Sequence, residues 1–394
     1  MRAGEMGRVS LKRSHRVLAG HPWIFSNEMS ESPKRFKSGS LVEVYDRQNS
    51  FLGIGYINPS SLIAIRLLTR KREPIDDGFF RRRIGNALHH RERFLGSVDS
   101  CRLVFSEGDF LPGLIVDRYG SCLSVQFLTL GMEGFRDTVL EILDEMLVPS
   151  VIVVKNDSQS RMLEGLPLLK EVIKGALDEL PVIREGEILL EVDPLSGQKT
   201  GFFLDQRENR LALDGMVRGG RGLDLFCYSG AWGLQAVRGG AEVTFIDVSE
   251  AALSQAQKNA RINGLEERCT FHKEDVFAFL ERLVQEGSRY DFIVLDPPAF
   301  VKSRGKIKEA LRGYREINAL AMRLLETGGI LATSSCSYHI EKTVFLEMLH
   351  NAARDAGKNP RLLEYRSQGK DHPVLLSVPE TEYLKCAFIE IEPL

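Results

Sequence analysis

Two side chains that could act as catalytic groups each follow an apolar run of the length of a buried strand. Cys336 ends GGILATSSC and lies between Ser335 and Ser337, and Asp296 ends YDFIVLD. A thiolate can add to C6 of a pyrimidine ring and thereby make the poorly nucleophilic C5 carbon reactive. Cysteine suits this step because nearby positive charge lowers its pKa below the usual value of about 8.5. We therefore predict that Cys336 is a nucleophile; the alternative is a buried structural cysteine.

Two prolines follow Asp296 directly, at positions 297 and 298. Proline neither continues the hydrogen bonds of a strand nor allows an immediate helix, so the backbone just past the carboxylate is fixed. The prolines would aim Asp296 into a cleft at the end of its strand. Asp-Pro-Pro at such a place is similar to a motif of methyltransferases, including those that act on amines and amides. The motif indicates the class of reaction and leaves the methylated atom open.

The stretch from Gly222 to Val248 is expected to bind the ligand on which these groups act. It reads as a strand, a turn containing Gly230, a short helix and a second strand that ends at Asp247. Ligands of open parallel sheets bind at the carboxyl ends of the strands, where Asp247 could accept hydrogen bonds from both hydroxyls of a ribose. Bulky residues stand where a dinucleotide-binding turn has two of its glycines, which disfavours a pyrophosphate. The stretch predicts a nucleoside-containing ligand; an ordinary βαβ unit is the alternative.

The first strand and its turn resemble motif I of class I S-adenosylmethionine-dependent methyltransferases, whose cofactor carries no phosphate. Asp224 lies in that strand and Gly230 follows six positions later. The usual E/D-x-G-x-G-x-G has become D-x-F-x-Y-x-G, so Phe226 and Tyr228 replace two glycines. Asp275, at the end of the third strand, could accept a hydrogen bond from the exocyclic amine of adenine, although Asp in such a place also caps helices.

Length and composition limit the class of protein. The 394 residues are too many for one ordinary core, so two or three domains are expected. No apolar run reaches the roughly 18 residues of a membrane span, so we expect a cytoplasmic protein without membrane contact. The six cysteines lie at least 21 positions apart, which excludes CxxC metal clusters and indicates free thiols. No bound metal is predicted.

Charge is unevenly distributed along the chain. Residues 1–95 hold 18 Lys and Arg against 9 Asp and Glu, a net charge of +9. The whole chain has a net charge of −2, so the remaining residues carry −11. A basic N-terminal part joined to an acidic body indicates a phosphate-rich partner, and a basic surface without a partner is the alternative.

Three domains are predicted, at residues 1–72, 73–187 and 188–394. The first alternates apolar and polar residues on both sides of a turn at residues 47–49, and its short strands resemble the PUA domain, a compact RNA-binding β-barrel. The second mixes strands and helices as a small central α+β domain without a catalytic constellation. In the third, strands near positions 223, 243, 270, 291 and 330 alternate with helices, which predicts a doubly wound, Rossmann-like α/β sheet.

Six segments together resemble the bacterial 23S ribosomal RNA large-subunit methyltransferase I family: GQKTGFFLDQRENR, DLFCYSGAWG, DPPAF, RGYREIN, SSCS and DHPVLLSVPETEYLK. The resemblance spans nearly the whole chain. It implies a PUA domain, a small central domain and a class I methyltransferase domain that forms 5-methylcytidine in ribosomal RNA with S-adenosylmethionine. Cys336 would be the nucleophile, and Asp296 would hydrogen-bond or protonate the cytosine ring. Related RNA 5-methylcytosine enzymes carry a second cysteine, which assists product release, where this chain has Ala299, so the acceptor of the C5 proton is unassigned.

Contact residues are predicted on the same basis. The expected cofactor contacts are Gln206, Arg207, Asp224, Phe226, Gly230, Asp247, Asp275 and Pro297. Cations mixed with aromatic residues suit phosphate contacts beside stacking faces. The expected RNA contacts are Lys12, Arg13, Arg16 and Trp23 near the start of the sequence, and Lys302, Arg304, Lys306, Arg312 and Arg315 after Asp-Pro-Pro. A solvated helix face is the alternative for this second group.

The expected partner is ribosomal RNA, either free or in a partly assembled large subunit, with the target base unstacked or flipped. Two other functions remain open. One is a ribosomal RNA guanine-N methyltransferase in which Cys336 is structural, and the other is a non-catalytic RNA-binding assembly factor. The sequence leaves open which nucleotide is modified and whether the protein is a monomer or a homodimer.

Overall fold

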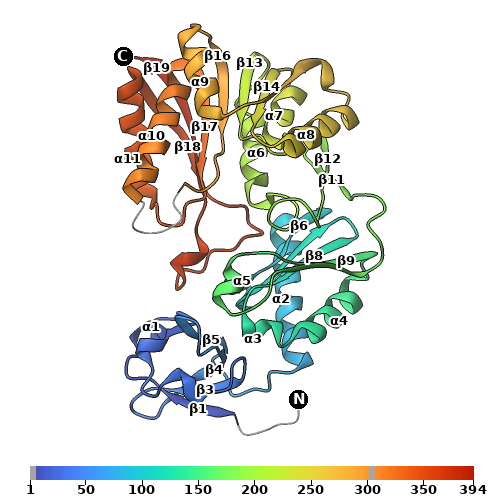
Figure 1. The fold of residues 1–394 in the computed structure, drawn as a ribbon, viewed down its shortest axis with the longest axis vertical. Helices are drawn as coiled ribbons and strands as arrows, with labels where there is room; N and C mark the ends of the chain where they lie inside the picture. Colours follow the sequence, from blue (N-terminus) through green and yellow to red (C-terminus); the bar gives the residue numbers. More distant parts are fainter. Residues whose placement is uncertain (1–5, 301–306) are drawn as a thin grey trace. The chain divides into compact units, whose positions relative to one another are not determined.

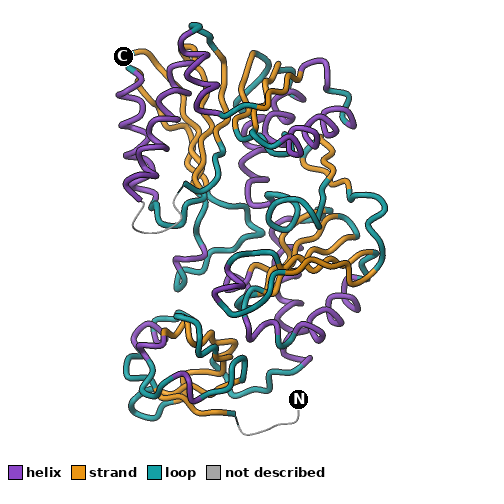
Figure 2. Tube along the Cα trace, in the orientation of Figure 1, coloured by secondary structure: helices purple, strands orange, loops and turns teal. Residues whose placement is uncertain are grey.

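The computed structural model describes residues 6–300 and 307–394 and forms two compact units (Figures 1 and 2). Unit 1 comprises the chain up to Pro181 together with Val192–Leu204 and Lys370–Thr381. Unit 2 comprises Val182–Glu191, Asp205–Gly369 and Glu382–Leu394. Each unit is therefore assembled from segments that are far apart in the sequence. Within the described residues, no helix is both long and apolar enough to cross a membrane.

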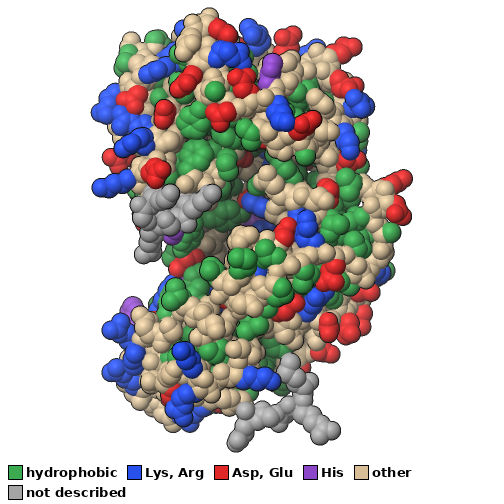
Figure 3. All heavy atoms as spheres, viewed as in Figure 1, with side chains coloured by type: hydrophobic (Ala, Val, Ile, Leu, Met, Phe, Trp, Pro, Cys, Tyr) green, Lys and Arg blue, Asp and Glu red, His purple; other side chains and the backbone are tan. Residues whose placement is uncertain are grey.

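The first part of unit 1 is a five-stranded sheet with one short helix. Its strands, in spatial order, are β1 (Gly7–Ser10), β3 (Leu41–Tyr45), β4 (Phe51–Ile57), β5 (Ile63–Thr69) and β2 (Trp23–Phe25); the helices are α1 (His15–Leu18) and the 3-10 turns η1 (Ser26–Glu28) and η2 (Pro33–Arg35). The predicted hairpin is confirmed, because β3 and β4 pair antiparallel up to Tyr45 and Phe51. In the turn Asn49 has a φ of 68°, a conformation that asparagine tolerates. Lys and Arg side chains gather over this part of the chain on the face drawn in Figure 3.

A second five-stranded sheet of unit 1 shares one buried core with the helices of this part of the chain. Its strands, in spatial order, are β10 (Leu169–Lys174), β9 (Val151–Asn156), β8 (Cys122–Phe127), β7 (Leu114–Tyr119) and β6 (Ser100–Phe105). The helices are α2 (Asp77–Leu95), α3 (Leu130–Glu133), α4 (Arg136–Leu147), α5 (Ser160–Leu163) and η3 (Ser106–Asp109). Helix α2 begins after Asp76, whose carboxylate accepts a hydrogen bond from Phe79 N (3.0 Å), and it buries Phe80 and Ile84. The edge strand β10 was not predicted, since its sequence LKEVIK carries three charges.

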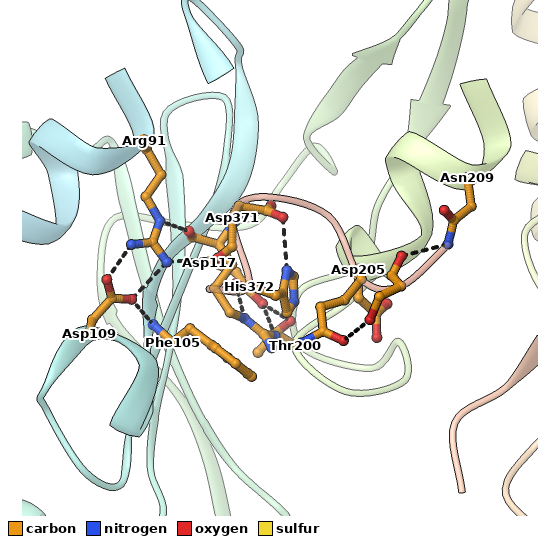
Figure 4. Close-up of polar contacts among 12 residues, drawn as sticks. Arg91, Phe105, Asp109, Asp117, Thr200, Asp205, Asn209, Asp371 and His372 are labelled. Atoms are coloured by element: carbon orange, nitrogen blue, oxygen red, sulfur yellow. Dashed lines mark hydrogen bonds and ion pairs between the residues drawn. The ribbon is translucent and has the colours of Figure 1, made fainter. Parts of the chain in front are cut away.

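The segment 370–381 returns to unit 1 through buried polar contacts (Figure 4). Arg91 of α2 forms an ion pair with Asp109 and donates a hydrogen bond to the backbone carbonyl of Asp371 (2.7 Å). The carboxylate of Asp371 accepts a hydrogen bond from the backbone N–H of Arg102 (3.0 Å). The late Asp-His-Pro stretch therefore fixes the returning chain in place, because a buried charge is stable only when it is paired and hydrogen-bonded.

The segment 192–204 is held in the same unit by a neighbouring ion pair. Arg102 donates two hydrogen bonds to Asp117 (2.7 and 2.8 Å), which is fully buried. Asp117 also accepts a hydrogen bond from the Thr200 hydroxyl, which lies 3.0 Å from the hydroxyl of Tyr119. The connection to unit 2 thus starts from a fixed point in unit 1.

Unit 2 is a seven-stranded sheet between two layers of helices (Figure 1). Its strands, in spatial order, are β15 (Cys269–Lys273), β14 (Glu242–Asp247), β13 (Arg221–Leu225), β16 (Tyr290–Leu295), β17 (Leu325–Ser335), β19 (Lys385–Pro393) and β18 (Lys358–Arg366). The helices of unit 2 are η4 (Leu204–Gln206), α6 (Arg207–Asp214), α7 (Ala231–Arg238), α8 (Glu250–Ile262), η5 (Glu266–Arg268), α9 (Val276–Gln285), α10 (Ile307–Leu324) and α11 (Lys342–Ala356). The short helix η7 (Pro379–Thr381) belongs to unit 1. The five predicted strands are β13 to β17, and all of them are parallel; β19 alone runs antiparallel to its two neighbours.

The core of unit 2 lies between the sheet and helices α9, α10 and α11, where Leu295, Ile317 and Phe345 belong to one buried cluster. A hairpin of β11 (Val182–Glu185) and β12 (Ile188–Glu191) completes the unit on the side of α6 and α7. Arg210 of α6 donates two hydrogen bonds of 2.5 Å to Glu185 of this hairpin, and both side chains are at most 2% exposed. The hairpin therefore fixes α6, the helix that follows Gln206.

Candidate active site

Three central strands of unit 2 place their carboxyl ends side by side. Leu225 of β13 is paired with Leu295 of β16, and Leu295 is paired with Thr333 of β17. Asp296 and Cys336, which follow β16 and β17, therefore leave the sheet at the same edge. The strand order reverses between β13 and β16, and this is the switch point at which open α/β sheets bind ligands.

The turn after β13 keeps the backbone of a glycine-rich motif with only one glycine. Phe226, Tyr228 and Gly230 have φ values of 60°, 48° and 78°, the left-handed region that favours glycine. For a residue with a Cβ this conformation costs about 1–2 kcal/mol. Strain of this kind persists where the surrounding structure imposes it, often at a ligand site. Phe226 and Tyr228 therefore adopt a backbone conformation that glycine would adopt without strain.

Asp224 is the buried carboxylate of this motif. It is 1% exposed, and its Oδ2 accepts a hydrogen bond from Gly233 N (2.8 Å). Its Oδ1 is buried and has no hydrogen-bond partner among the described residues. Burial raises the pKa of Asp224 well above its ordinary value of 3.8, and the charges of Asp296 and Asp247 act in the same direction. The site thus holds a buried acceptor oxygen among three carboxylates, a suitable place for a ligand that is a donor or a cation.

Two further carboxylates follow β14 and β15. Asp247 ends β14 and accepts hydrogen bonds from Tyr228 N (3.1 Å) and Ser249 N (2.9 Å), which fixes it beside the strained turn. Asp275 is exposed and caps α9, where its Oδ1 accepts a hydrogen bond from Ala278 N (3.1 Å). The helix-cap interpretation of Asp275 is therefore correct, and β15, the strand before it, pairs in parallel with β14, which ends at Asp247.

Asp296 is held by donors from two other elements. Its Oδ2 accepts hydrogen bonds from Gln206 Nε2 (3.0 Å) and from the Trp232 indole N–H (3.1 Å). Gln206 Nε2 also lies 3.0 Å from Ser334 Oγ on β17, and Gln206 Oε1 accepts a hydrogen bond from Asn209 (2.6 Å). One amide therefore bridges the ends of β16 and β17 and fixes the direction of the Asp296 carboxylate.

Cys336 is the first residue after β17 and is partly exposed. The hydroxyls of Tyr314 and Ser337 share a hydrogen bond of 3.0 Å beside it. The buried Lys385 ammonium donates hydrogen bonds to the carbonyls of Ser337 (2.7 Å) and Tyr383 (2.8 Å). Burial lowers the pKa of Lys385 to about 8, while the charge of an ionised Cys336 opposes that change. A fixed cation therefore interacts electrostatically with the thiol, and such a cation favours the thiolate.

Residues 169–371 match the S-adenosylmethionine-dependent methyltransferase family, and residues 8–70 match a PUA-like domain. Ribosomal RNA large subunit methyltransferase I of Shewanella amazonensis is 39% identical over 386 residues, which cover 96% of this chain and 98% of that protein. The protein of the same name from Klebsiella pneumoniae is 38% identical over 382 residues, which cover 95% of each chain. The chain belongs to the ribosomal RNA large subunit methyltransferase I family.

Solved structures agree with the fold. A candidate S-adenosylmethionine-dependent methyltransferase from Streptococcus mutans, 21% identical, has a TM-score of 0.84 and covers 98% of this chain and 100% of its own. A candidate methyltransferase complexed with SAH, 20% identical, also has a TM-score of 0.84, with coverage of 98% and 99%. The predictions of an α/β methyltransferase fold, a PUA-like part and S-adenosylmethionine as cofactor are confirmed.

The switch point of this member of the methyltransferase I family fits that cofactor. The buried Oδ1 of Asp224 has no partner among the described residues, and the carboxylates of Asp247 and Asp296 nearby would favour a cation such as the sulfonium of the cofactor. A Cβ at Gly230 would lie 3.0 Å from Ala256, so the turn approaches α8 closely at the one glycine that the motif retains. Of the other predicted contacts, Arg207 begins α6 and Pro297 follows Asp296; both are buried.

Sequence reasoning missed several residues that the fold of this family member brings to the site: Trp232, Asn209, Ser334, Tyr314 and Lys385. All five lie in segments quoted above for the family resemblance, so their membership of those segments was the available signal. Their meeting at one site was not marked locally; β19, which carries Lys385, lies next to β17 in the sheet but follows it by about fifty residues in the chain.

The predicted RNA contacts of unit 1 lie around α1 and β2. Lys12 and Arg13 are exposed. Arg16 pairs with Glu380 (2.7 Å), and its guanidinium carbon lies 6.0 Å from the centre of the Trp23 ring. Cationic and aromatic surfaces are thus adjacent here, and their contact with RNA stays a prediction.

The second predicted group is only partly described. Lys302, Arg304 and Lys306 lie outside the described residues. Arg312 on α10 is exposed, whereas Arg315 forms two hydrogen bonds with Asp355 of α11 (2.5 and 2.6 Å). The charge of Arg315 is therefore already balanced within the helical layer, and of the described pair Arg312 is the better candidate for a phosphate.

Proposed function

We propose that the protein transfers a methyl group from S-adenosylmethionine to C5 of a cytosine in ribosomal RNA of the large subunit, with Cys336 as the nucleophile. One observation carries the proposal. Cys336 and Asp296 follow adjacent parallel strands, with Gln206 bridging the two strand ends and the Lys385 ammonium bonded to the carbonyl of Ser337, the residue after Cys336. The names of the relatives, which specify ribosomal RNA, support the substrate class.

The cofactor supplies an electrophilic methyl group at the switch point. Asp247 would accept hydrogen bonds from the ribose hydroxyls and Asp275 from the adenine amine, as their positions after β14 and β15 suit. Asp224 and Gly230 would shape the turn against it. The remaining proposed contacts are Gln206, Arg207, Phe226 and Pro297.

The proposed chemistry begins with the Cys336 thiolate, which the Lys385 ammonium stabilises. Sγ would form a bond to C6 of the cytosine, and the electron pair displaced onto C5 would take the methyl group as the bond between that group and the cofactor sulfur breaks. Asp296, held at Oδ2 by two N–H donors, would hydrogen-bond or protonate the ring as charge develops on it. Loss of the C5 proton to a base would then break the Sγ–C6 bond, regenerate the Cys336 thiolate and leave 5-methylcytidine in the RNA chain. Ala299 stands where related enzymes have a second cysteine, so that base is unassigned, and a water molecule is our proposal.

The test is transfer of labelled methyl to large-subunit ribosomal RNA that lacks the modification, followed by nucleoside analysis. Wild type should yield 5-methylcytidine and Cys336→Ala none. Cys269→Ala is the matched control, since Cys269 is also partly exposed, and burial raises the pKa of its thiol to about 12, which makes it a poor nucleophile. Free RNA and partly assembled subunits are compared as substrates.

A second experiment detects the covalent bond itself. With RNA whose cytosines carry fluorine at C5, the elimination step cannot occur, so wild type should form a complex stable to denaturing electrophoresis and Cys336→Ala should not. A methylated guanine that survives Cys336→Ala would instead assign the protein as a guanine-N methyltransferase. Cofactor binding without turnover on any ribosomal RNA would favour an assembly factor.

A further inference from the structure

Unit 1 contains a pocket of about 420 Å³ that no residue of the candidate active site lines. Its wall is formed by the end of β5 and the chain after it, by α2, by the turn that follows β6, and by Gly20, Pro22 and Leu375. Four cations line it: Arg70, Lys71, Arg82 and Arg83. Its volume is in the range of small-ligand sites, which is about 300–1,000 Å³.

The two carboxylates of the wall already have partners. Glu73 forms an ion pair with Arg82 (2.5 Å). Glu107 accepts hydrogen bonds from the Trp23 indole N–H (2.7 Å) and from the Ser106 hydroxyl (2.5 Å). Both acids are therefore satisfied without the remaining cations of the pocket.

Three cations remain without a carboxylate partner among the described residues: Arg70, Lys71 and Arg83. Arg83 donates a hydrogen bond to the Leu68 carbonyl (3.1 Å), while its Nε is buried without a partner in the part of the chain that the structure describes. Burial lowers the pKa of both Arg70 and Arg83, so both guanidinium groups are partly desolvated. The charge of Glu73 acts on Arg83 in the opposite direction, but Glu73 forms its ion pair with Arg82, so Arg70 and Arg83 still favour the binding of an anion.

An exposed aromatic ring stands beside these cations. Phe110 is 53% exposed, and its ring centre lies 5.4 Å from the guanidinium carbon of Arg83. It adopts the left-handed conformation (φ 58°, ψ 31°) after η3, in a turn held by the hydrogen bond from Leu111 N to Ser106 O (3.0 Å). A phenylalanine held in this strained state and left in solvent is unusual, and such outliers gather at ligand sites.

We propose that this pocket binds one nucleotide of a single-stranded part of the RNA substrate, with the phosphate between Arg70 and Arg83 and the base stacked on Phe110. The combination of cations with an exposed ring is that of single-strand binding surfaces. The inference rests on the proposed function only in taking RNA as the substrate. It adds a second RNA-binding site on the protein, outside unit 2.

The test measures binding of a fluorescein-labelled, single-stranded RNA octanucleotide to the full chain by anisotropy over a range of salt concentrations. Arg83→Met should weaken binding about 10-fold and reduce the salt slope by about 0.7, the value for one phosphate of a single strand. Arg93→Met is the matched control, because Arg93 is an exposed arginine on the same helix outside the pocket. It should change affinity less than twofold.

Stacking is tested separately. Phe110→Ala should weaken binding about 5- to 100-fold, the range of one base–aromatic stack, and Phe110→Trp should retain it. Phe94→Ala, at another exposed ring of unit 1, is the control. Cytidine monophosphate as competitor distinguishes an RNA strand from a free nucleotide: the proposal requires the octanucleotide to bind more tightly.

Binding needs no turnover, so failure of methyl transfer and failure of this pocket are separate results. In the methylation assay Arg83→Met should raise KM for RNA and leave kcat and cofactor affinity unchanged. Equal losses in Arg83→Met and Arg93→Met would overturn the pocket in favour of a diffuse electrostatic effect. Wild-type affinity in Phe110→Ala would overturn the stacking contact.

Discussion

Asp224→Asn tests whether the buried carboxylate of motif I is maintained at a cost to stability. Burial raises the pKa of Asp224 well above its ordinary value of 3.8. The folded protein therefore retains this proton at pH values where the unfolded chain has lost it. As pH rises above 3.8, the free energy of unfolding falls by about 1.4 kcal/mol per pH unit until the raised pKa is reached, and it stays lower beyond that point.

Asparagine keeps an acceptor for the Gly233 N–H and cannot ionise. We expect the free energy of unfolding of Asp224→Asn to lack this dependence on pH. The difference in unfolding free energy between the variant and wild type should therefore increase, as pH rises, by up to about 1.4 kcal/mol per pH unit. The same substitution should weaken S-adenosylmethionine binding, because the buried oxygen is a proposed cofactor contact. A gain in stability with a loss of binding is the usual signature of a residue kept for function.

The assay is urea unfolding at about pH 5, 6 and 7, with linear extrapolation to zero denaturant. The chain has two tryptophans, so in a Trp23→Phe background the fluorescence of Trp232 reports on unit 2. Asp214→Asn, which removes an exposed carboxylate from α6, controls for the change in net charge. An unchanged pH slope, or a variant less stable than wild type at the highest pH, would refute the reasoning.

Gly222→Ala should destabilise unit 2 by about 1–3 kcal/mol in urea unfolding, because the added Cβ would overlap the Phe292 ring on β16. Gly215→Ala, where the nearest atom to the Cβ is a carbonyl oxygen at 3.6 Å, should change stability little. Trp232→Phe removes one of the two described donors to Asp296 Oδ2 and should lower kcat for methyl transfer about 10- to 100-fold, with an unchanged circular dichroism spectrum. A wild-type kcat would mean that the other donor suffices. Affinity for ribosomal RNA should fall with salt, with a logarithmic slope of about −0.7 for each single-strand phosphate contacted, and a flat dependence would contradict a cationic RNA interface.

The sequence by itself determined the class of fold and the edge of the sheet where the candidate site lies. Each strand and each helix has its own hydrophobic period in the sequence, so five apolar strands alternating with amphipathic helices could be predicted. This alternation predicts a parallel sheet. Parallel strands end at one edge, so Asp247, Asp296 and Cys336 could be placed together without coordinates. The hairpin that precedes Phe51 could be predicted for the same reason, because its turn and the alternating apolar and polar residues of its strands are neighbours in the sequence.

Only the tertiary structure decided how those groups are held. Lys385 reaches the end of β17 because β19 inserts antiparallel between β17 and β18, a pairing that no local pattern specifies. Phe226 and Tyr228 have positive φ values, which their residue types disfavour, so the conformation of this turn comes from the surrounding structure. Arg315 was predicted for RNA from its charge, yet it pairs with Asp355, because a charge in the sequence does not reveal which neighbour will balance it. Helices and strands follow from the pattern of neighbouring residues, whereas contacts between distant segments form only when the whole chain packs.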